Sequence, residues 1–355
     1  MKYRLEQIVD VTMGQSPKSI YYNSNGKGYP FLQGNKTFGL RYPVFDTYTE
    51  VMTKAAKAGD VIMSVRAPVG ELNITPVDMC LGRGVCSLRM KNGNQDFLYY
   101  MMKYYIPHLI NKESGTVFGS VSKKDISSLE VDIPEDVEIQ RKIARYLLMF
   151  DEKIELNEQI NKNLAEQSQT IYQQYFITEA GQDWPLGHLS DLVNVKYGKD
   201  HKKLADGIYP VYGSGGIMRY VERPLYEKES VLIPRKGTLN NVMYVNQPFW
   251  SVDTMFYTEM KQPNVAKFVY HFMKSKDLAS MNAGSAVPSM TTAILNALEI
   301  SIPSAETLKH FEISVAPMYE MMQKNEEQSH KLTKLRDVLL PKLMSGEIDV
   351  STLDL

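Results

Sequence analysis

The sequence of 355 residues contains one series of motifs twice, and this duplication limits the possible folds more than any other feature. The matched segments keep the same order and an offset near 170 residues: 4–17 with 185–200, 29–35 with 209–215, 59–70 with 229–240, 97–103 with 268–274, 115–122 with 284–291, and 129–134 with 298–303. Because all of these matches lie in register, the sequence predicts two copies of one structural unit.

Each half of the sequence predicts a globular module followed by an elongated helix. Short apolar runs bounded by turn residues, such as 59–65 and 85–90, are typical of strands. Residues 97–109 and 265–279 have the pattern of helices that cover a sheet. The predicted fold class is therefore α+β. The predicted boundaries are 1–135 for module 1, 136–180 for helix 1, 181–305 for module 2, and 306–355 for helix 2 with a C-terminal tail.

The two long helices carry the spacing of a coiled-coil seam, but the centre of the seam is polar. NEQINKNL at 157–164 is matched by NEEQSHKL at 325–332. The predicted seam residues recur at steps of three and four: Ile143, Leu147, Phe150, Ile154, Asn157, Asn161, Leu164 and Ile171 in helix 1, and Met318, Met321, Asn325, Leu332, Leu335 and Leu339 in helix 2. Polar seam residues lower stability but specify register and partner.

Two arrangements of these helices fit the pattern. In one, the helices are separate and each packs on its own module. In the other, which we favour, they pair as an antiparallel coiled coil related by a pseudo-twofold axis, with a module at each end. A helix of about 36 residues spans about 54 Å, so such a pair would separate the modules by a set length.

Composition indicates a cytoplasmic protein. Hydrophobic residues make up 43% and charged residues 23% of the chain, as in ordinary globular proteins. No apolar run approaches the roughly 20 residues that span a bilayer, and the N-terminus lacks the apolar core of a signal peptide. The two cysteines, Cys80 and Cys86, have no histidine nearby and predict buried thiols rather than a metal site. The formal net charge is −1, yet the predicted modules are weakly basic and the helices weakly acidic.

Three segments resemble the specificity subunit of type I restriction–modification systems. Residues 58–73 with 80–90 are similar to the core pattern of that family's target-recognition domains, residues 5–17 to their entry, and residues 335–350 to the end of the second spacer helix. Module 2 departs from the pattern in two places. It has no counterpart of the LGRG at residues 81–84, and its core pattern starts with ESVLIP at residues 229–234, where a Gly-Asp start is usual.

The resemblance implies a function in DNA recognition. Each module would read one half of a bipartite, asymmetric target in double-stranded DNA, and the helices would set the gap. Two modification subunits, which methylate adenine with S-adenosylmethionine, would dock on this chain, and restriction subunits with translocase and nuclease activity would join them. The chain itself would bind no cofactor and catalyse no reaction.

The residues themselves also predict that the chain is not an enzyme. An adenine methyltransferase needs a [DN]-P-P-[FY] loop for the flipped base, and the nearest match, NQPF at 246–249, has Gln in place of the first Pro. YGSGG at 212–216 lacks the spacing of a dinucleotide-binding turn, and no phosphate-binding P-loop is present. The six histidines are scattered, so no metal site is predicted.

Polar and basic loop residues are the candidates for DNA contacts, since such side chains suit base edges and phosphates. The candidates are Gln15, Ser16, Lys18, Gln33, Asn35, Lys36, Arg41, Ser122, Lys123 and Lys124 in module 1, and Lys199, His201, Lys202, Lys203, Ser214, Arg219, Lys236, Asn240, Asn241, Ser289 and Thr291 in module 2. Three arginines next to strands, Arg66, Arg83 and Arg235, are predicted to be structural, with Arg66 matched to Arg235.

Two other functions remain open from the sequence. The chain could be a non-catalytic coiled-coil scaffold that binds only proteins, in which case weak retention on a phosphate-bearing column would not change with salt. It could also be an enzyme with a site between the modules, although no convergent set of acid, base and nucleophile supports this.

Overall fold

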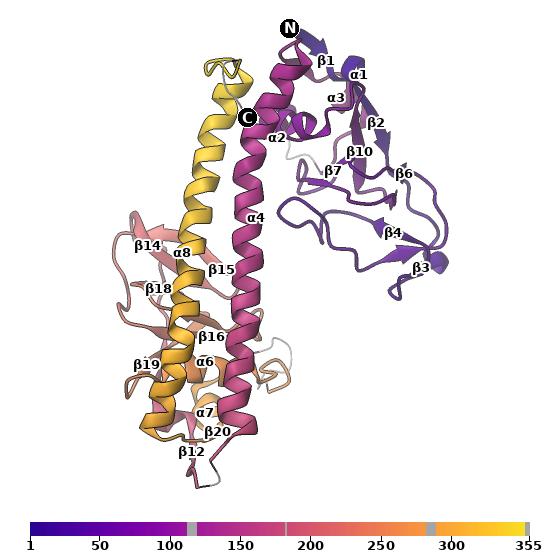
Figure 1. Cartoon of the computed structure of the whole chain (residues 1–355). Helices are drawn as coiled ribbons and strands as arrows, with labels where there is room; N and C mark the ends of the chain where they lie inside the picture. The colour runs from indigo at the N-terminus through magenta and orange to yellow at the C-terminus, as the bar shows by residue number, and fades with distance from the viewer. Residues whose placement is uncertain (112–118, 182, 282–288, 352–355) are drawn as a thin grey trace. The chain divides into compact units, whose positions relative to one another are not determined.

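The computed structural model describes residues 1–111, 119–181, 183–281 and 289–351 (Figure 1). The chain divides into two compact units, each of which holds one module and part of each long helix. Unit 1 contains Met1–Gln159 and Lys324–Leu355, and unit 2 contains Ile160–Gln323. Among the described residues, no helix combines the length and the apolar character needed to cross a membrane.

The module of unit 1 is built from three sheets and short helices. Its central sheet has the order β2-β10-β7-β8, a second sheet has the order β3-β5-β4-β9-β6, and β1 pairs with β11. The strands are β1 (Lys2–Arg4), β2 (Val9–Met13), β3 (Tyr22–Asn23), β4 (Tyr29–Leu32), β5 (Tyr48–Thr49), β6 (Ala55–Ala56), β7 (Val61–Ser64), β8 (Leu72–Ile74), β9 (Met79–Leu81), β10 (Val85–Met90) and β11 (Glu130–Asp132). The helices are α1 (Leu5–Ile8), η1 (Ser19–Tyr21), α2 (Gln95–Asn111) and α3 (Lys123–Ser127).

The module of unit 2 repeats this plan. Its central sheet has the order β13-β19-β16-β17, a smaller sheet has the order β15-β14-β18, and β12 pairs with β20. The strands are β12 (Leu186–His188), β13 (Val193–Tyr197), β14 (Asp206–Gly213), β15 (Gly216–Val221), β16 (Ser230–Pro234), β17 (Met243–Val245), β18 (Trp250–Ser251), β19 (Met255–Met260) and β20 (Glu299–Ser301). The helices are α5 (Leu189–Leu192), α6 (Ala266–Lys274) and α7 (Thr292–Asn296).

Equivalent strands pair in equivalent ways, which confirms the duplicated α+β fold. The pairing of β1 with β11 in unit 1 corresponds to that of β12 with β20 in unit 2, and both are antiparallel. The pairing of β4 with β9 corresponds to that of β14 with β18, and both are parallel. Parts of the matched segments 115–122 and 284–291 lie outside the described residues.

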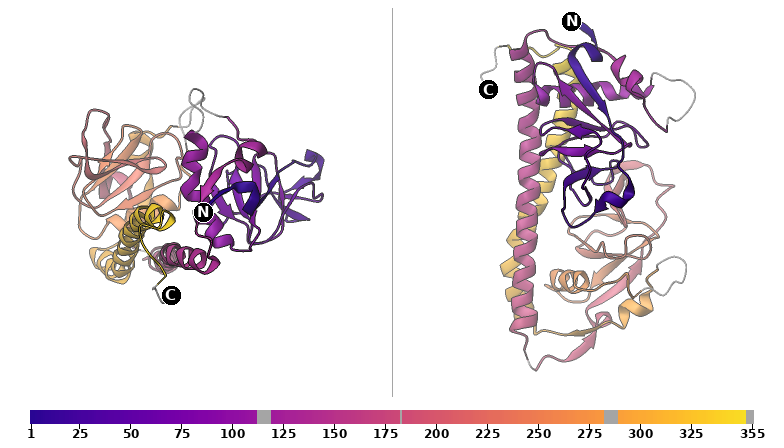
Figure 2. Two further views of the ribbon diagram at one scale, coloured as in Figure 1. Left: turned by 90° about the horizontal axis from the view of Figure 1, so that it is seen from above. Right: turned by 90° about the vertical axis from the view of Figure 1, so that its right-hand side faces the viewer.

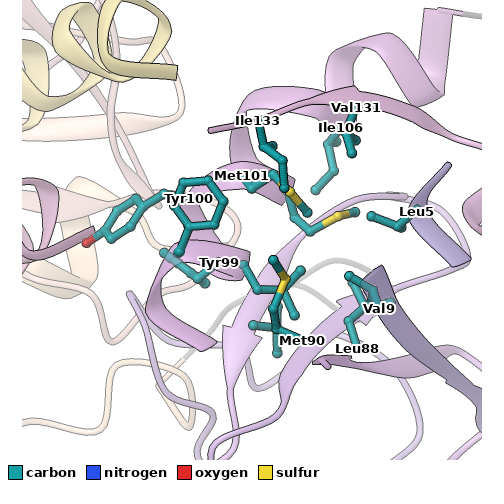
Figure 3. Packing of buried hydrophobic residues seen from close by; sticks show 14 of the residues in the cluster. Leu5, Val9, Leu88, Met90, Tyr99, Tyr100, Met101, Ile106, Val131 and Ile133 are labelled. Carbon is teal, nitrogen blue, oxygen red and sulfur yellow. The ribbon is translucent and has the colours of Figure 1, made fainter. Parts of the chain in front are cut away.

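In unit 1, the main core forms where α2 lies between the central sheet and the long helices. Side chains from α1, β2, β10, α2 and β11 meet in this core (Figure 3). Residues 97–102 of α2 are all buried, because one side of the helix faces the sheet and the other faces Ile143 and Leu147. Unit 2 has a corresponding core, in which Phe268 of α6 packs against Tyr172 of α4, and Tyr172 packs in turn against Phe311 of α8.

The long helices are α4 (Val137–Gln173), which ends in one π-helical turn (Gln174–Thr178), and α8 (Ala305–Met344). They lie side by side and run in opposite directions (Figure 2). In unit 1 the Asn157 amide donates to the Asn325 carbonyl over 3.3 Å and to the Ser329 hydroxyl over 3.1 Å. In unit 2 the Asn161 amide donates to the Met322 carbonyl over 3.0 Å. The predicted antiparallel pairing is therefore present, and the helices also pack on the modules.

The burial of the predicted seam residues follows the pairing except at two positions. Ile143, Leu147, Ile154, Asn157 and Asn325 are buried, and Phe150, Asn161, Leu164, Ile171, Met318, Leu332 and Leu339 are half-buried. In contrast, Met321 is 49% and Leu335 is 52% exposed.

The prediction that Met321 and Leu335 belong to the seam is wrong. Arg336, the neighbour of Leu335, is buried and forms an ion pair with Asp151 on α4. Met322, the neighbour of Met321, supplies the carbonyl that accepts from Asn161. The residues that contact α4 at these two layers are therefore Met322 and Arg336, one position after the apolar residues that the periodicity selected.

Candidate nucleic-acid interface

In module 1, loops that follow β2, β4 and β9 meet at one end of the sheets. Backbone hydrogen bonds join them: the Gln15 amide donates to the Leu81 carbonyl over 2.9 Å, and the Gly84 amide donates to the Gln33 carbonyl over 3.0 Å. The Val121 amide donates to the Val65 carbonyl over 2.9 Å, which attaches a further segment. We call this set of loops cluster 1; its described residues are 14–18, 33–36, 65–68, 82–84 and 119–124.

The glycines of cluster 1 allow its loops to approach closely. A Cβ atom on Gly84 would overlap the carbonyl oxygen of Gln33, and one on Gly14 would overlap the carbonyl oxygen of Gly82. Since these obstacles are backbone atoms, they cannot move aside as a flexible side chain would. The LGRG segment therefore connects the loops, and its geometry presents Arg83 to solvent.

Cluster 1 carries exposed basic side chains: Lys18, Lys36, Arg66, Arg83, Lys123 and Lys124. The prediction that Arg66 and Arg83 are structural is wrong, because both are exposed and neither guanidinium has a carboxylate within ion-pair distance in the described part of the chain. The glycines on both sides of Arg83 in LGRG are the sequence signal that could have identified an exposed side chain at a tight turn.

Module 2 forms the same arrangement with different residues. The Lys199 amide donates to the Ser251 carbonyl over 2.8 Å, the Val252 amide to the Tyr212 carbonyl over 3.1 Å, and the Met290 amide to the Arg235 carbonyl over 2.9 Å. We call these loops cluster 2; its described residues are 198–203, 213–216, 235–241, 252–254 and 289–291. Its exposed basic side chains are Lys199, Lys202, Lys203 and Lys236.

The two clusters also correct the matching of the arginines. An isolated bridge joins Arg66 to Ser120 in module 1, and the corresponding bridge in module 2 joins Lys236 to Ser289. Arg66 is therefore equivalent to Lys236, one position after Arg235. Arg235 itself is structural, as predicted, because its guanidinium donates to the Asp253 carbonyl over 3.3 Å and lies 5.5 Å from the centroid of the Tyr197 ring.

Two copies of one loop cluster, one in each half of a chain with paired long helices, match a known family. The model of the type I restriction modification DNA specificity domain matches residues 1–166 and again residues 181–337. The chain belongs to this family.

Relatives and a solved structure agree with this membership. The type I restriction enzyme MjaIX specificity subunit of Methanocaldococcus jannaschii is 23% identical, over 99% of this chain and 94% of that protein. The HindI specificity subunit of Haemophilus influenzae is 23% identical, over 83% of this chain and 88% of that protein. Another relative from M. jannaschii is 39% identical over 163 residues, which are 44% of this chain and 38% of that relative.

The structural comparison supports the fold. The crystal structure of a type I restriction-modification system S subunit from M. genitalium superposes with a TM-score of 0.64 at 20% identity, over 97% of this chain and 96% of that chain. At this level of identity the likeness shows that the two proteins share a fold.

Several predicted contact residues lie exposed in the clusters of this family member. Gln15, Gln33 and the lysines named above are exposed, whereas Ser16, Ser214, Ser289 and the ring of His201 are half-buried. The Ser16 hydroxyl accepts from the Arg83 amide over 3.1 Å. These residues stay candidates for DNA contact, because their side chains reach the surface of the clusters.

Arg41 does not fit the prediction, because the structure places its side chain inside unit 1. It is 4% exposed, and its guanidinium lies 2.5 Å from the Asp96 carboxylate. Arg219 is similarly occupied, since its guanidinium lies 2.7 Å from Asp206 and donates to the Leu204 carbonyl over 3.0 Å. Their partners come from distant parts of the sequence or from a neighbouring strand, so spacing could not reveal them.

Other candidates support the loops. The Asn240 amide donates to Asp277 over 3.0 Å, and the Asn241 amide donates to the Ser214 carbonyl over 2.8 Å. The Asn35 amide donates to Glu71 over 2.6 Å. Ser122 and Thr291 each accept from an amide in the first turn of α3 and α7, and therefore cap these helices. Such residues shape the clusters whether or not they also contact a ligand.

Proposed function

We propose that this chain is the DNA-recognition subunit of a type I restriction–modification complex, in which each loop cluster reads one half of a bipartite, asymmetric target. The observation that carries this proposal is the duplication of a basic loop cluster on equivalent modules of one chain. The clusters differ in their side chains, as an asymmetric target requires. Exposed lysines and arginines supply the phosphate contacts on which DNA affinity depends, and polar neighbours supply contacts to base edges.

The long helices provide the remaining parts of this function. In the proposed complex they set the spacing between the half-sites and dock two modification subunits, and restriction subunits join that assembly. S-adenosylmethionine belongs to the modification subunits, and this chain binds no cofactor. The names of the relatives, which are specificity subunits of type I restriction enzymes, support this division of roles.

The chain's own residues support a non-catalytic role. In the NQPF segment, the side chain that would have to face a flipped base is Phe249, and it is 0% exposed in a core of unit 2. The Gln247 amide donates to the Tyr212 hydroxyl over 3.2 Å, so this segment is held against β14. The alternative function, a scaffold that binds only proteins, does not account for basic side chains on both loop clusters.

Exchange of one module tests the two-reader proposal. When residues 1–135 are replaced by the module of another family member, methylome sequencing of cells with the partner methyltransferase should show one changed half-site and one unchanged half-site. Cells without the partner should show no methylation of the target. A change in both halves at once would contradict the proposal that each module reads independently.

A second test concerns Arg83 in cluster 1. Arg83→Ala should weaken DNA binding by the assembled complex by about 1–3 kcal/mol, because an arginine that makes a bidentate contact with a base edge contributes about this much. Lys91→Ala is the matched control, since Lys91 is also exposed but lies at the end of β10 away from cluster 1. The complex with Lys91→Ala should bind DNA with the affinity of the native complex. Titrations at several salt concentrations measure both, and equal affinities for all proteins would remove Arg83 from the interface.

A further inference from the structure

A buried ion pair joins the module to both long helices in unit 1. The Arg336 guanidinium of α8 lies 2.5 Å from the Asp151 carboxylate of α4, and the side chains are 7% and 3% exposed. The Tyr100 hydroxyl of α2 donates to the same carboxylate over 2.6 Å. Both charges are desolvated, and the Arg336 guanidinium also lies 2.8 Å from the carboxylate of Asp337, the next residue on α8. Among the described residues, Asp151 has no second cation within ion-pair distance, and an unpaired charge in such a place is strongly destabilising.

In the described part of unit 2, the residues equivalent to Asp151 and Arg336 form no ion pair. The helix repeats are offset by 168 residues, as in the match of 157–164 with 325–332, so Asp151 corresponds to Tyr319 and Arg336 corresponds to Ser168. The match of 97–103 with 268–274 makes Tyr100 equivalent to His271.

The equivalents of these three groups are neutral in unit 2. The nearby cation, Lys267 of α6, lies 5.5 Å from the centroid of the Tyr319 ring and pairs with Glu312 of α8 over 2.5 Å. Nε2 of His271 lies 2.9 Å from the Tyr319 hydroxyl, and Nδ1 lies 2.8 Å from Oε1 of Gln169. Burial, together with nearby Lys274, lowers the pKa of His271 to about 4, so the ring is neutral at pH 7. The Ser168 hydroxyl donates to the Ala165 carbonyl over 2.9 Å. No charge in this set needs a partner from the opposite helix.

This difference matters because a duplicated chain can pair wrongly. If α4 paired with α4 of a second copy, Asp151 would face Ser168, the equivalent of Arg336, and its charge would be buried without a partner. If α8 paired with α8 of a second copy, Arg336 would face Tyr319, would lose the Asp151 carboxylate and would keep only that of Asp337, which is 52% exposed. The pairing of α4 with α8 is the one arrangement of the three in which the two buried charges neutralise each other.

We infer that the buried Asp151–Arg336 pair makes α4 select α8 and reject the same helix of a second copy of the chain. This role goes beyond DNA recognition and does not depend on it.

The polar layer at the centre of the seam does not discriminate in this way. Asn157 meets Asn325, its own equivalent in the repeat, so either wrong pairing would again place Asn against Asn. Apolar residues contribute some selectivity through size, because Ile143 of unit 1 corresponds to Phe311 of unit 2. The charged pair differs from both, since its effect comes from leaving a charge unpaired in the wrong pairings.

The test begins with the assembled full chain and a protease site inserted after Ala180, an exposed residue. Cleavage gives an N-terminal piece that contains α4 and a C-terminal piece that contains α8, and helix pairing holds them together. After equilibration, native mass spectrometry distinguishes the mixed dimer, which has one piece of each kind, from the two homodimers, which have two copies of one piece. The native sequence should give almost only the mixed dimer. Tyr100→His, Asp151→Tyr and Arg336→Ser together copy His271, Tyr319 and Ser168 of unit 2, and should raise the ratio of homodimers to mixed dimer by roughly 100-fold or more.

Two further variants keep the test decisive if the triple variant does not fold. Asp151→Asn with Arg336→Gln removes both charges with little change in shape and should also raise the homodimer ratio. Asp151→Arg with Arg336→Asp reverses the pair and should keep the mixed dimer dominant.

The matched control removes an exposed ion pair from α4. Arg145→Gln with Glu152→Gln deletes a pair whose side chains are 55% and 50% exposed, and should leave the ratio unchanged. The inference is wrong if the neutral variants raise the ratio of homodimers to mixed dimer by less than tenfold over the native sequence. It is also wrong if the control raises this ratio as much as they do.

Discussion

Arg336→Met is expected to lower the free energy of unfolding of unit 1 by about 3–5 kcal/mol, the typical effect of removing one partner of a buried ion pair. The methionine keeps most of the aliphatic packing, so the main loss is electrostatic: the Asp151 carboxylate, 3% exposed, retains only the Tyr100 hydroxyl as a close partner among those described. Denaturant titration followed by hydrogen exchange of amides in α2 and α4 measures this effect within unit 1.

Two companion variants separate the charge effect from packing. Arg336→Met combined with Asp151→Leu should recover most of the lost stability, because neither charge of this buried pair is left without the other. Arg145→Met is the surface control, and should change the free energy of unfolding by less than about 1 kcal/mol, since the Arg145–Glu152 pair is exposed. If Arg336→Met were as mild as the surface control, the buried pair would not stabilise unit 1.

The prediction of the fold succeeded where the signal was periodic or repeated. Apolar runs such as 61–64 and 85–90 became strands β7 and β10, and the paired helices contain both predicted polar segments. These features depend on local patterning and on the duplication, both of which are visible in one sequence. The error at Leu335 has a physical cause: periodicity counts apolar residues, so it cannot assign a seam position to an arginine that is neutralised by an aspartate 185 positions away.

The candidate site was predictable as loops but not as individual side chains. The segments around Gln15, Gln33 and Ser122 do meet in cluster 1, because β2 and β4 end there and because the Val121 amide donates to the Val65 carbonyl. The role of each side chain depends on long-range partners, and Arg41 shows this clearly, since Asp96 withdraws it from the surface. Arg83 shows the reverse case, in which proximity to a strand predicted a structural role that the exposed side chain does not have.

A matched insertion of seven residues in each long helix is expected to lengthen the gap between the half-sites by about three base pairs. The insertions are placed after Gln159 and after Gln323, where one compact unit ends and the other begins. Seven residues add about 10 Å along a helix and nearly two full turns, so the seam stays close to its original phase. Contacts inside each unit, such as Asn157 with Asn325 and Asn161 with Met322, are then unaltered.

Methylome sequencing of cells that carry the insertion variant and its methyltransferase partner gives the result directly, because both half-sites should keep their sequences while the spacing grows. An insertion of two residues at the same places is the control for phase. It rotates the following segment by about 200°, which turns buried seam residues to solvent, so helix pairing and methylation should both be lost. If the seven-residue variant methylated the original spacing, the helices would not determine the distance between the half-sites, and the proposed function of the coiled coil would reduce to docking of the partner subunits.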